Sequence, residues 1–139
     1  MSKALAIRDY FLAELSRRPL SGIEDSHIYL QLNAGLARAQ RPAIVLEMGS
    51  ESIDESQYEE CERVLSLIVR VIVDGDDPMA AADPVVMAID ARLAALDPGD
   101  LFLSITLSRI ERQSSDIASA ALVSLAYDVR YATPSKIFE

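Results

Sequence analysis

The chain has 139 residues, half of them hydrophobic, and a net charge of −9 from 13 basic and 22 acidic side chains. This length and composition suit one domain with a buried core and argue against a disordered chain. The negative charge argues against a nucleic-acid binder, because it repels phosphate backbones, and no run of about 18 apolar residues could span a membrane. We therefore expect a single domain over residues 1–139, without a signal peptide, since charged residues interrupt its first 20 positions.

An amphipathic helix and a short strand are predicted at the start of the chain. Four apolar residues recur at the three- and four-residue spacing of one helix face, namely Ala4, Ile7, Phe11 and Leu15. This spacing predicts a helix over residues 3–18, which Pro19 ends. In His27–Leu32, apolar residues alternate with polar ones, and this pattern predicts a half-buried strand.

Two further strands are predicted on either side of an acidic segment. The apolar run Ala43–Met48 follows Pro42 and predicts a buried strand. Gly49–Glu59 is rich in serine and acidic residues, has no basic residue, and predicts an exposed, mobile loop. Cys61–Val73 alternates again, which predicts a long strand with one apolar face and a second, mixed face that carries Arg70.

A turn and a second helix are predicted next. Asp74–Pro78 has the composition of a turn. Asp83 followed by Pro84 is typical of an N-cap with proline at the first helical position. The helix would end before Asp97–Asp100, with one apolar face made of Val85, Ile89, Leu93 and Leu96.

The end of the chain predicts an antiparallel hairpin. Apolar and polar residues alternate in Leu103–Gln113 and in Ala118–Thr133, on either side of a polar turn at about Ser114–Ile117. One face of the last strand should hold Val123, Leu125, Tyr127 and Val129. The order of elements is α-β-β-β-α-β-β, which predicts an α+β fold: a mostly antiparallel sheet with helices packed on one face.

Residues that commonly carry catalysis are scarce. His27 is the only histidine and lies on the polar face of its predicted strand, whereas Cys61, the only cysteine, begins an apolar face as a small buried hydrophobe. A Cys–His dyad would need these two side chains to meet, and nothing orients them. One His and one Cys cannot build the usual zinc site, and Asp74–Asp77 is too short for a calcium loop. Nucleotide-binding and hydrolase motifs are absent, so we expect no catalytic residue, no metal site and no cofactor.

The C-terminal half resembles a known family. A helix ending in ARLAAL, a strand reading LFLSITLSRIERQ and a final strand ending in LAYDVRYATP occupy Ala91–Leu96, Leu101–Gln113 and Leu125–Pro134. These segments, together with the size and the order of elements, are similar to the phage tail terminator family, to which minor tail protein U of lambda-like phages belongs. The resemblance implies a structural virion protein of the tail, assembled in the host cytoplasm and without catalytic residues.

The resemblance also implies partners. Tail terminators form a six-membered ring on the head-proximal end of the tail tube, stop its polymerisation and present a surface to the head connector, while DNA passes through the lumen. The expected partners are therefore further copies of the chain, the tail tube protein and the head-tail connector protein, with no membrane involved. An acidic ring suits this role, because a negative channel does not retain a polyanion in transit.

Contact residues are expected where charge is concentrated. Half of the 22 acids lie in Glu47–Glu62 and Asp74–Asp83, and the long strand between them offers arginines that could pair with a neighbour's acids. The expected contact residues are Arg63, Arg70, Glu51, Asp54, Glu55, Glu59, Asp76 and Asp77. Two other interpretations stay open, a soluble cellular binding or adaptor domain that takes a peptide at its sheet edge, and a hydrolase with an unrecognised site.

Overall fold

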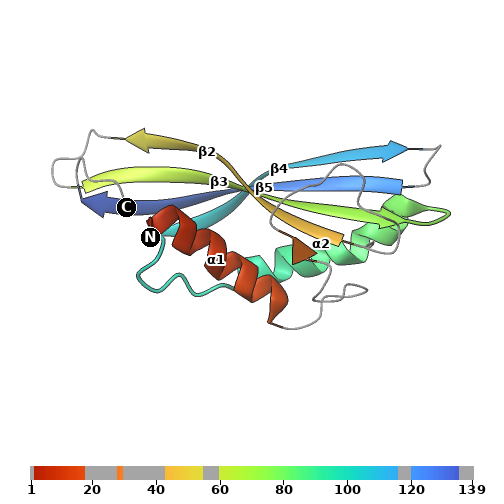
Figure 1. Ribbon diagram of the computed structural model, residues 1–139, viewed down its shortest axis with the longest axis horizontal. Helices are drawn as coiled ribbons and strands as arrows, with labels where there is room; N and C mark the ends of the chain where they lie inside the picture. The colour runs from red at the N-terminus through yellow and green to blue at the C-terminus, as the bar shows by residue number, and fades with distance from the viewer. Residues whose placement is uncertain (1, 18–27, 30–42, 55–59, 116–119, 135–139) are drawn as a thin grey trace.

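The computed structural model describes residues 2–17, 28–29, 43–54, 60–115 and 120–134 (Figure 1). These residues form two helices and five strands. In chain order they are α1 (Lys3–Ser16), β1 (Ile28–Tyr29), β2 (Ala43–Asp54), β3 (Glu60–Asp74), α2 (Pro78–Ala94), β4 (Ser104–Ser115) and β5 (Ala120–Pro134). Neither of these two helices is long and apolar enough to cross a membrane.

The strands form one sheet in the order β1-β2-β3-β5-β4. The two-residue strand β1 is parallel to β2, whereas every other neighbouring pair is antiparallel. Both helices lie on the same side of the sheet (Figure 1). The predicted α+β class, a mostly antiparallel sheet with helices packed on one face, is confirmed. Of the predicted strand His27–Leu32, only Ile28–Tyr29 falls within the described residues.

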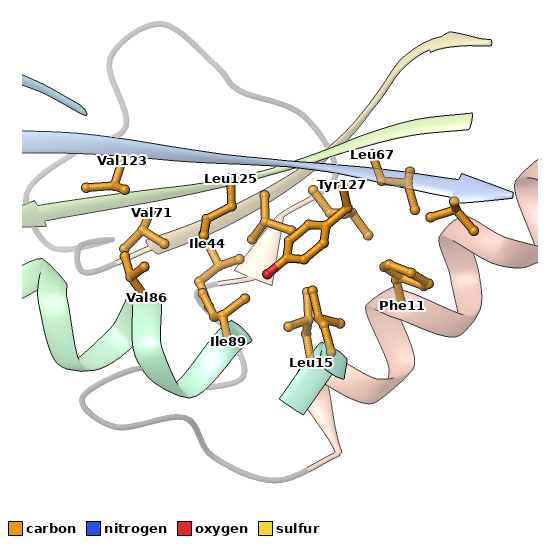
Figure 2. Close-up of a cluster of buried hydrophobic side chains, with 14 of the residues drawn as sticks. Phe11, Leu15, Ile44, Leu67, Val71, Val86, Ile89, Val123, Leu125 and Tyr127 are labelled. Carbon is orange, nitrogen blue, oxygen red and sulfur yellow. The ribbon is translucent and has the colours of Figure 1, made fainter. Parts of the chain in front are cut away.

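The core lies between the helices and one face of the sheet, called here the helix face. Figure 2 shows Leu15 of α1 and Ile89 of α2 directed toward Leu125 and Tyr127 of β5. Every second residue of β3 from Cys61 to Val73 is buried on this face, as predicted. Each large apolar side chain that is fully buried contributes about 1.5–3 kcal/mol, so this layer supplies most of the stability of the packing between the sheet and the helices.

Polar groups fix the ends of α1. Ser2 is its N-cap, and its hydroxyl accepts a hydrogen bond from the Leu5 amide over 3.2 Å. At the other end, Arg92 of α2 donates to the carbonyl oxygens of Glu14 and Leu15 over 3.4 and 3.1 Å. A cation at a helix C-terminus satisfies otherwise unpaired carbonyls and favours the helix dipole. The two helices are therefore joined by electrostatics as well as by apolar packing.

The acidic segment after Met48 differs from its prediction. β2 continues to Asp54, so Gly49–Asp54 forms strand rather than loop. Its register against β3 shifts once, between Met48 and Glu51, which marks a bulge. The prediction of a loop is wrong for this part, because backbone pairing with the long strand β3 outweighs the loop-like composition, and its mobility stays a prediction. Residues 49–53 are exposed, as predicted, and residues 55–59 lie outside the described residues.

The second helix begins earlier than predicted. Asp77 is the N-cap, accepting from the Ala80 amide over 3.3 Å, and Pro78 stands at the first helical position. Asp83 and Pro84 lie inside the helix. Both Asp-Pro pairs have the composition of a helix start, and the earlier pair takes the role because β3 ends at Asp74.

The predicted hairpin is confirmed. β4 and β5 pair antiparallel from Ser104 opposite Arg130 to Ser115 opposite Ala120, with a bulge between Leu107 and Arg109. The expected face of β5, from Val123 to Val129, is buried under the helices. The predicted turn at Ser114–Ile117 begins later, because β4 runs to Ser115, and residues 116–119 lie outside the described residues.

Candidate functional site

Arg63 is the centre of a buried polar cluster on the helix face. The residue is 5% exposed, its Nε donates to Thr133 Oγ1 over 3.2 Å, and its Nη1 lies 3.5 Å from Glu51 Oε1. The hydroxyl of Tyr131 donates to the same oxygen of Glu51. These side chains come from β2, β3 and β5, so the cluster ties three neighbouring strands together.

The surroundings of the cluster shift the pKa values of Tyr131 and Arg63. Burial raises the pKa of the Tyr131 phenol above its ordinary value, and the hydrogen bond to Glu51 raises it further. Burial alone would lower the pKa of Arg63, but Tyr131 and Glu51 raise it, so the guanidinium stays charged. Tyr131 therefore stays protonated and Arg63 stays charged at neutral pH, and their contacts connect neighbouring strands of the sheet.

Arg70 forms a second intrachain cluster on the opposite side of the sheet, the second face. Its Nε lies 3.0 Å from Glu47 Oε2, and its Nη1 donates to Ser124 Oγ over 3.0 Å. The sequence suggested that Arg63 and Arg70 would pair with acids of a neighbouring subunit. In the structure both are engaged by acids of their own chain, which lie on the adjacent strand β2.

The expected acidic contact residues whose side chains are described lie at separate places. Glu51 belongs to the cluster around Arg63, and Asp77 caps α2. Asp76 is exposed in the turn between β3 and α2. Asp54 is placed by its backbone at the end of β2, and Glu55 and Glu59 lie outside the described residues.

The residues considered for chemistry form no centre in the described part of the chain. Cys61 is a free, buried thiol that is 1% exposed, while His27 lies outside the described residues. Among the described residues, no three His, Cys, Asp or Glu side chains come together as metal ligands would. A cleft of about 410 Å³ lies between the helices and is lined by charged side chains, among them Glu14, Arg92 and Asp97, and by Tyr10 and small or apolar residues.

The sequence analysis raised a sheet edge as a binding surface, but it did not show which strands form the edges. Among the described residues, β4 is paired on one side only, and β1 pairs with β2 at Ile44 and Val45 alone. Four large apolar side chains are exposed on or beside these edge strands: Met48, Ile53, Leu103 and Ile110. Alternation of apolar and polar residues within each segment showed which side chains share a face of the sheet. Which strands lie at the edges depends on the strand order, and no local sequence pattern gives that order.

Comparisons with known proteins bear on the fold. The chain matches a protein of the "Virion of native gene transfer agent (GTA) particle" with a TM-score of 0.66 and 17% sequence identity, over 91% of this chain and 95% of the other. The two proteins share a fold. No protein-family model and no curated protein sequence matches the chain.

Proposed function

We propose that the chain is a structural virion protein that acts as a tail terminator. In this role it forms a six-membered ring on the head-proximal end of a tail tube, ends tube polymerisation and joins the head connector. The observation that carries the proposal is the shared fold with a virion protein over nearly the full length of both chains. One fold can serve several functions, so this likeness supports the role as an analogy, which the assembly experiment below tests.

Two further observations support the role. The segments that resemble tail terminators, Leu101–Gln113 and Leu125–Pro134, include nearly all of β4 and the second half of β5, so the resemblance falls on the long hairpin of the sheet. In the described residues, the polar clusters around Arg63 and around Arg70 link neighbouring strands. An active site would instead place a reactive group in a cleft.

Tail assembly with and without the chain tests this proposal. Particles made without it should contain tail tubes of uncontrolled length that carry no heads, and supplying the chain should restore tubes of one length with heads joined. Met87→Ala, on the exposed side of α2 at 65% exposure, should restore them equally well. Normal, joined tails in the absence of the chain would contradict the proposal, and recovery of the chain only with a cellular peptide would favour the adaptor interpretation.

A further inference from the structure

The two outer edges of the sheet carry opposite charge. Along β4, Arg109 and Arg112 outnumber Glu111, whereas the outer part of β2, from Leu46 to Asp54, carries acids and no base. Arg112 is exposed and has no ion-pair partner among the described residues, and the Arg109–Glu111 pair is itself exposed, at 68% and 51% of the two side chains. Glu47 and Glu51 of the acidic edge also pair with Arg70 and Arg63 of their own chain, so a basic residue of a second copy would share these acids. In a chain of net charge −9, a basic edge beside an acidic edge still favours contact between copies.

The strand directions allow the two edges to pair. Neighbouring strands alternate in direction from β2 through β3 and β5 to β4. A second copy placed beside the first in the same orientation therefore presents its β2 antiparallel to β4 of the first. Backbone groups along such unpaired edges are ready to accept an added strand.

The register within one chain shows which residues would meet. Two residues are called level here when the paired residues of β3 and β5 connect them straight across the sheet. In this sense Ser104 is level with Ser52, and Arg109 is level with Glu47. The exposed Met48 is level with Leu107. A level arrangement of two copies thus sets a basic residue beside an acidic one and apolar residues beside each other, and cross-strand pairs of both kinds stabilise a sheet.

We propose that β4 of one copy, over Ser104–Ile110, pairs antiparallel with the outer edge of β2 of a second copy, over Leu46–Ser52. The occupant of each edge is thus another copy of this chain, with Arg109 beside Glu47 and Ser104 beside Ser52. The contact joins two different surfaces, so it repeats head to tail. In the ring of the proposed function the repeat closes, and each copy covers the edge of its neighbour. This inference rests on the ring of the proposed function.

A two-fold contact between two β4 strands is the competing arrangement. Centred on Ile110, it would set Arg109 of each copy beside Glu111 of the other, so charge alone does not exclude it. It would leave the acidic edge of β2 open in both copies and could not continue into a ring. The head-to-tail arrangement covers both edges, and the two make different predictions for a pair of cysteine variants.

Disulfide trapping between Ser52→Cys and Ser104→Cys tests the register. Opposed residues in an antiparallel pair have Cα atoms about 4.5–5.5 Å apart, which a disulfide can bridge. Within one chain the two positions lie three strand spacings apart, roughly 14 Å, so the bond can form only between copies. The two variants carry different tags, are mixed at high concentration and are oxidised; Cys61 stays in place because it is buried.

The control is Ser114→Cys mixed with Ser52→Cys. Ser114 lies on the same strand as Ser104 and is exposed. It is level with Val73 of β3, which lies one residue beyond the start of β2 at Ala43, so in the proposed register it has no partner on β2 of the second copy. We expect the Ser52–Ser104 mixture to give at least about tenfold more mixed disulfide than the control, the ratio that a preference of ~1.4 kcal/mol produces. Equal yields, or Ser104→Cys pairing with itself as efficiently as with Ser52→Cys, would overturn the inference.

The same variants separate this inference from the proposed function. Trapped Ser52–Ser104 pairs in solution, with the chain absent from tail ends, would uphold the edge contact and refute the terminator role. A six-membered ring at the tail end whose subunits are not trapped by these cysteines would uphold the role and refute the edge contact.

Discussion

The hydroxyl of Tyr127 on β5 donates a hydrogen bond to Asp90 Oδ1 on α2 over 2.9 Å, and this contact joins the second helix to a central strand. Tyr127 is 2% exposed, so the bond lies in the core layer. Tyr127→Phe should lower the free energy of unfolding by about 1.5–3 kcal/mol, because it removes a bond to a charged group and leaves the carboxylate without its donor. Urea unfolding followed by circular dichroism measures the change.

Tyr10→Phe is the matched control for that variant. Tyr10 donates to the carbonyl oxygen of Asp97 at the surface, where water can replace the lost hydroxyl. Its loss should lower the free energy of unfolding by about 0.5 kcal/mol. Equal losses in the two variants would contradict the importance given to the contact between Tyr127 and Asp90.

Stability should fall at alkaline pH. Burial, followed by hydrogen bonds to Asp90 and Glu51, raises the pKa of Tyr127 and of Tyr131 in the folded chain. An unfolded tyrosine ionises near pH 10, so above that pH the unfolded chain loses protons that the folded chain retains. The stabilisation is therefore fully present below about pH 10 and is lost as the pH rises toward the folded pKa values.

Urea midpoints at about pH 8 and about pH 11 measure this loss. The variant with both Tyr127→Phe and Tyr131→Phe is less stable at the lower pH, but its midpoint should depend less on pH than that of the unaltered chain. If both proteins lose the same amount between the two conditions, other groups cause the alkaline loss.

The ion pair of Arg63 should matter far more than an exposed pair. Arg63→Ala removes a cation that is 5% exposed and leaves Glu51 without its ion-pair partner and Thr133 without its donor, so we expect a loss of about 2–4 kcal/mol. Arg109→Ala breaks an exposed pair with Glu111 and should cost about 0–0.5 kcal/mol in the isolated chain. Thermal unfolding of both variants makes the comparison, and a loss for Arg109→Ala as large as for Arg63→Ala would contradict it.

The start of α2 can be tested at its two Asp-Pro pairs. Asp77→Ala removes the N-cap and should destabilise the chain by about 1 kcal/mol, whereas Asp83→Ala lies within the helix and should change stability by less than about 0.5 kcal/mol. Pro84→Ala should stabilise the chain, because proline inside a helix removes a backbone hydrogen bond. Chemical unfolding of the three variants checks the order, and a larger loss for Asp83→Ala than for Asp77→Ala would move the helix start back to the predicted position.

The sequence predicted what depends on local periodicity. Alternation identified the buried face of β3 from Cys61 to Val73 and the pairing of β4 with β5, because the side chains of a strand reverse direction at each residue. It failed at Gly49–Asp54, where acidic and serine residues indicated a loop while pairing with β3 extends the strand. Exposed edge strands tolerate such polar residues, so their composition approaches that of a loop.

The candidate contact residues were harder to predict, because charge partners depend on which strands are neighbours. The pairing of Arg63 and Arg70 with acids of a neighbouring subunit stays a prediction. Within the chain, Glu51 and Glu47 meet these arginines from the adjacent strand β2. Each glutamate lies diagonally across from its arginine on the neighbouring strand. Such pairs can be identified only when the register between the two strands is known, and the sequence alone does not give that register. The same missing information concealed the charge difference between the two edges of the sheet.

Electron cryo-microscopy of intact particles, with averaging of the tail end nearest the head, tests the central claim most directly. The tail terminator role predicts six copies of this chain in one closed ring at the head-proximal end of the tube. A different number of copies, or absence of the chain from that end of the tail, would contradict it.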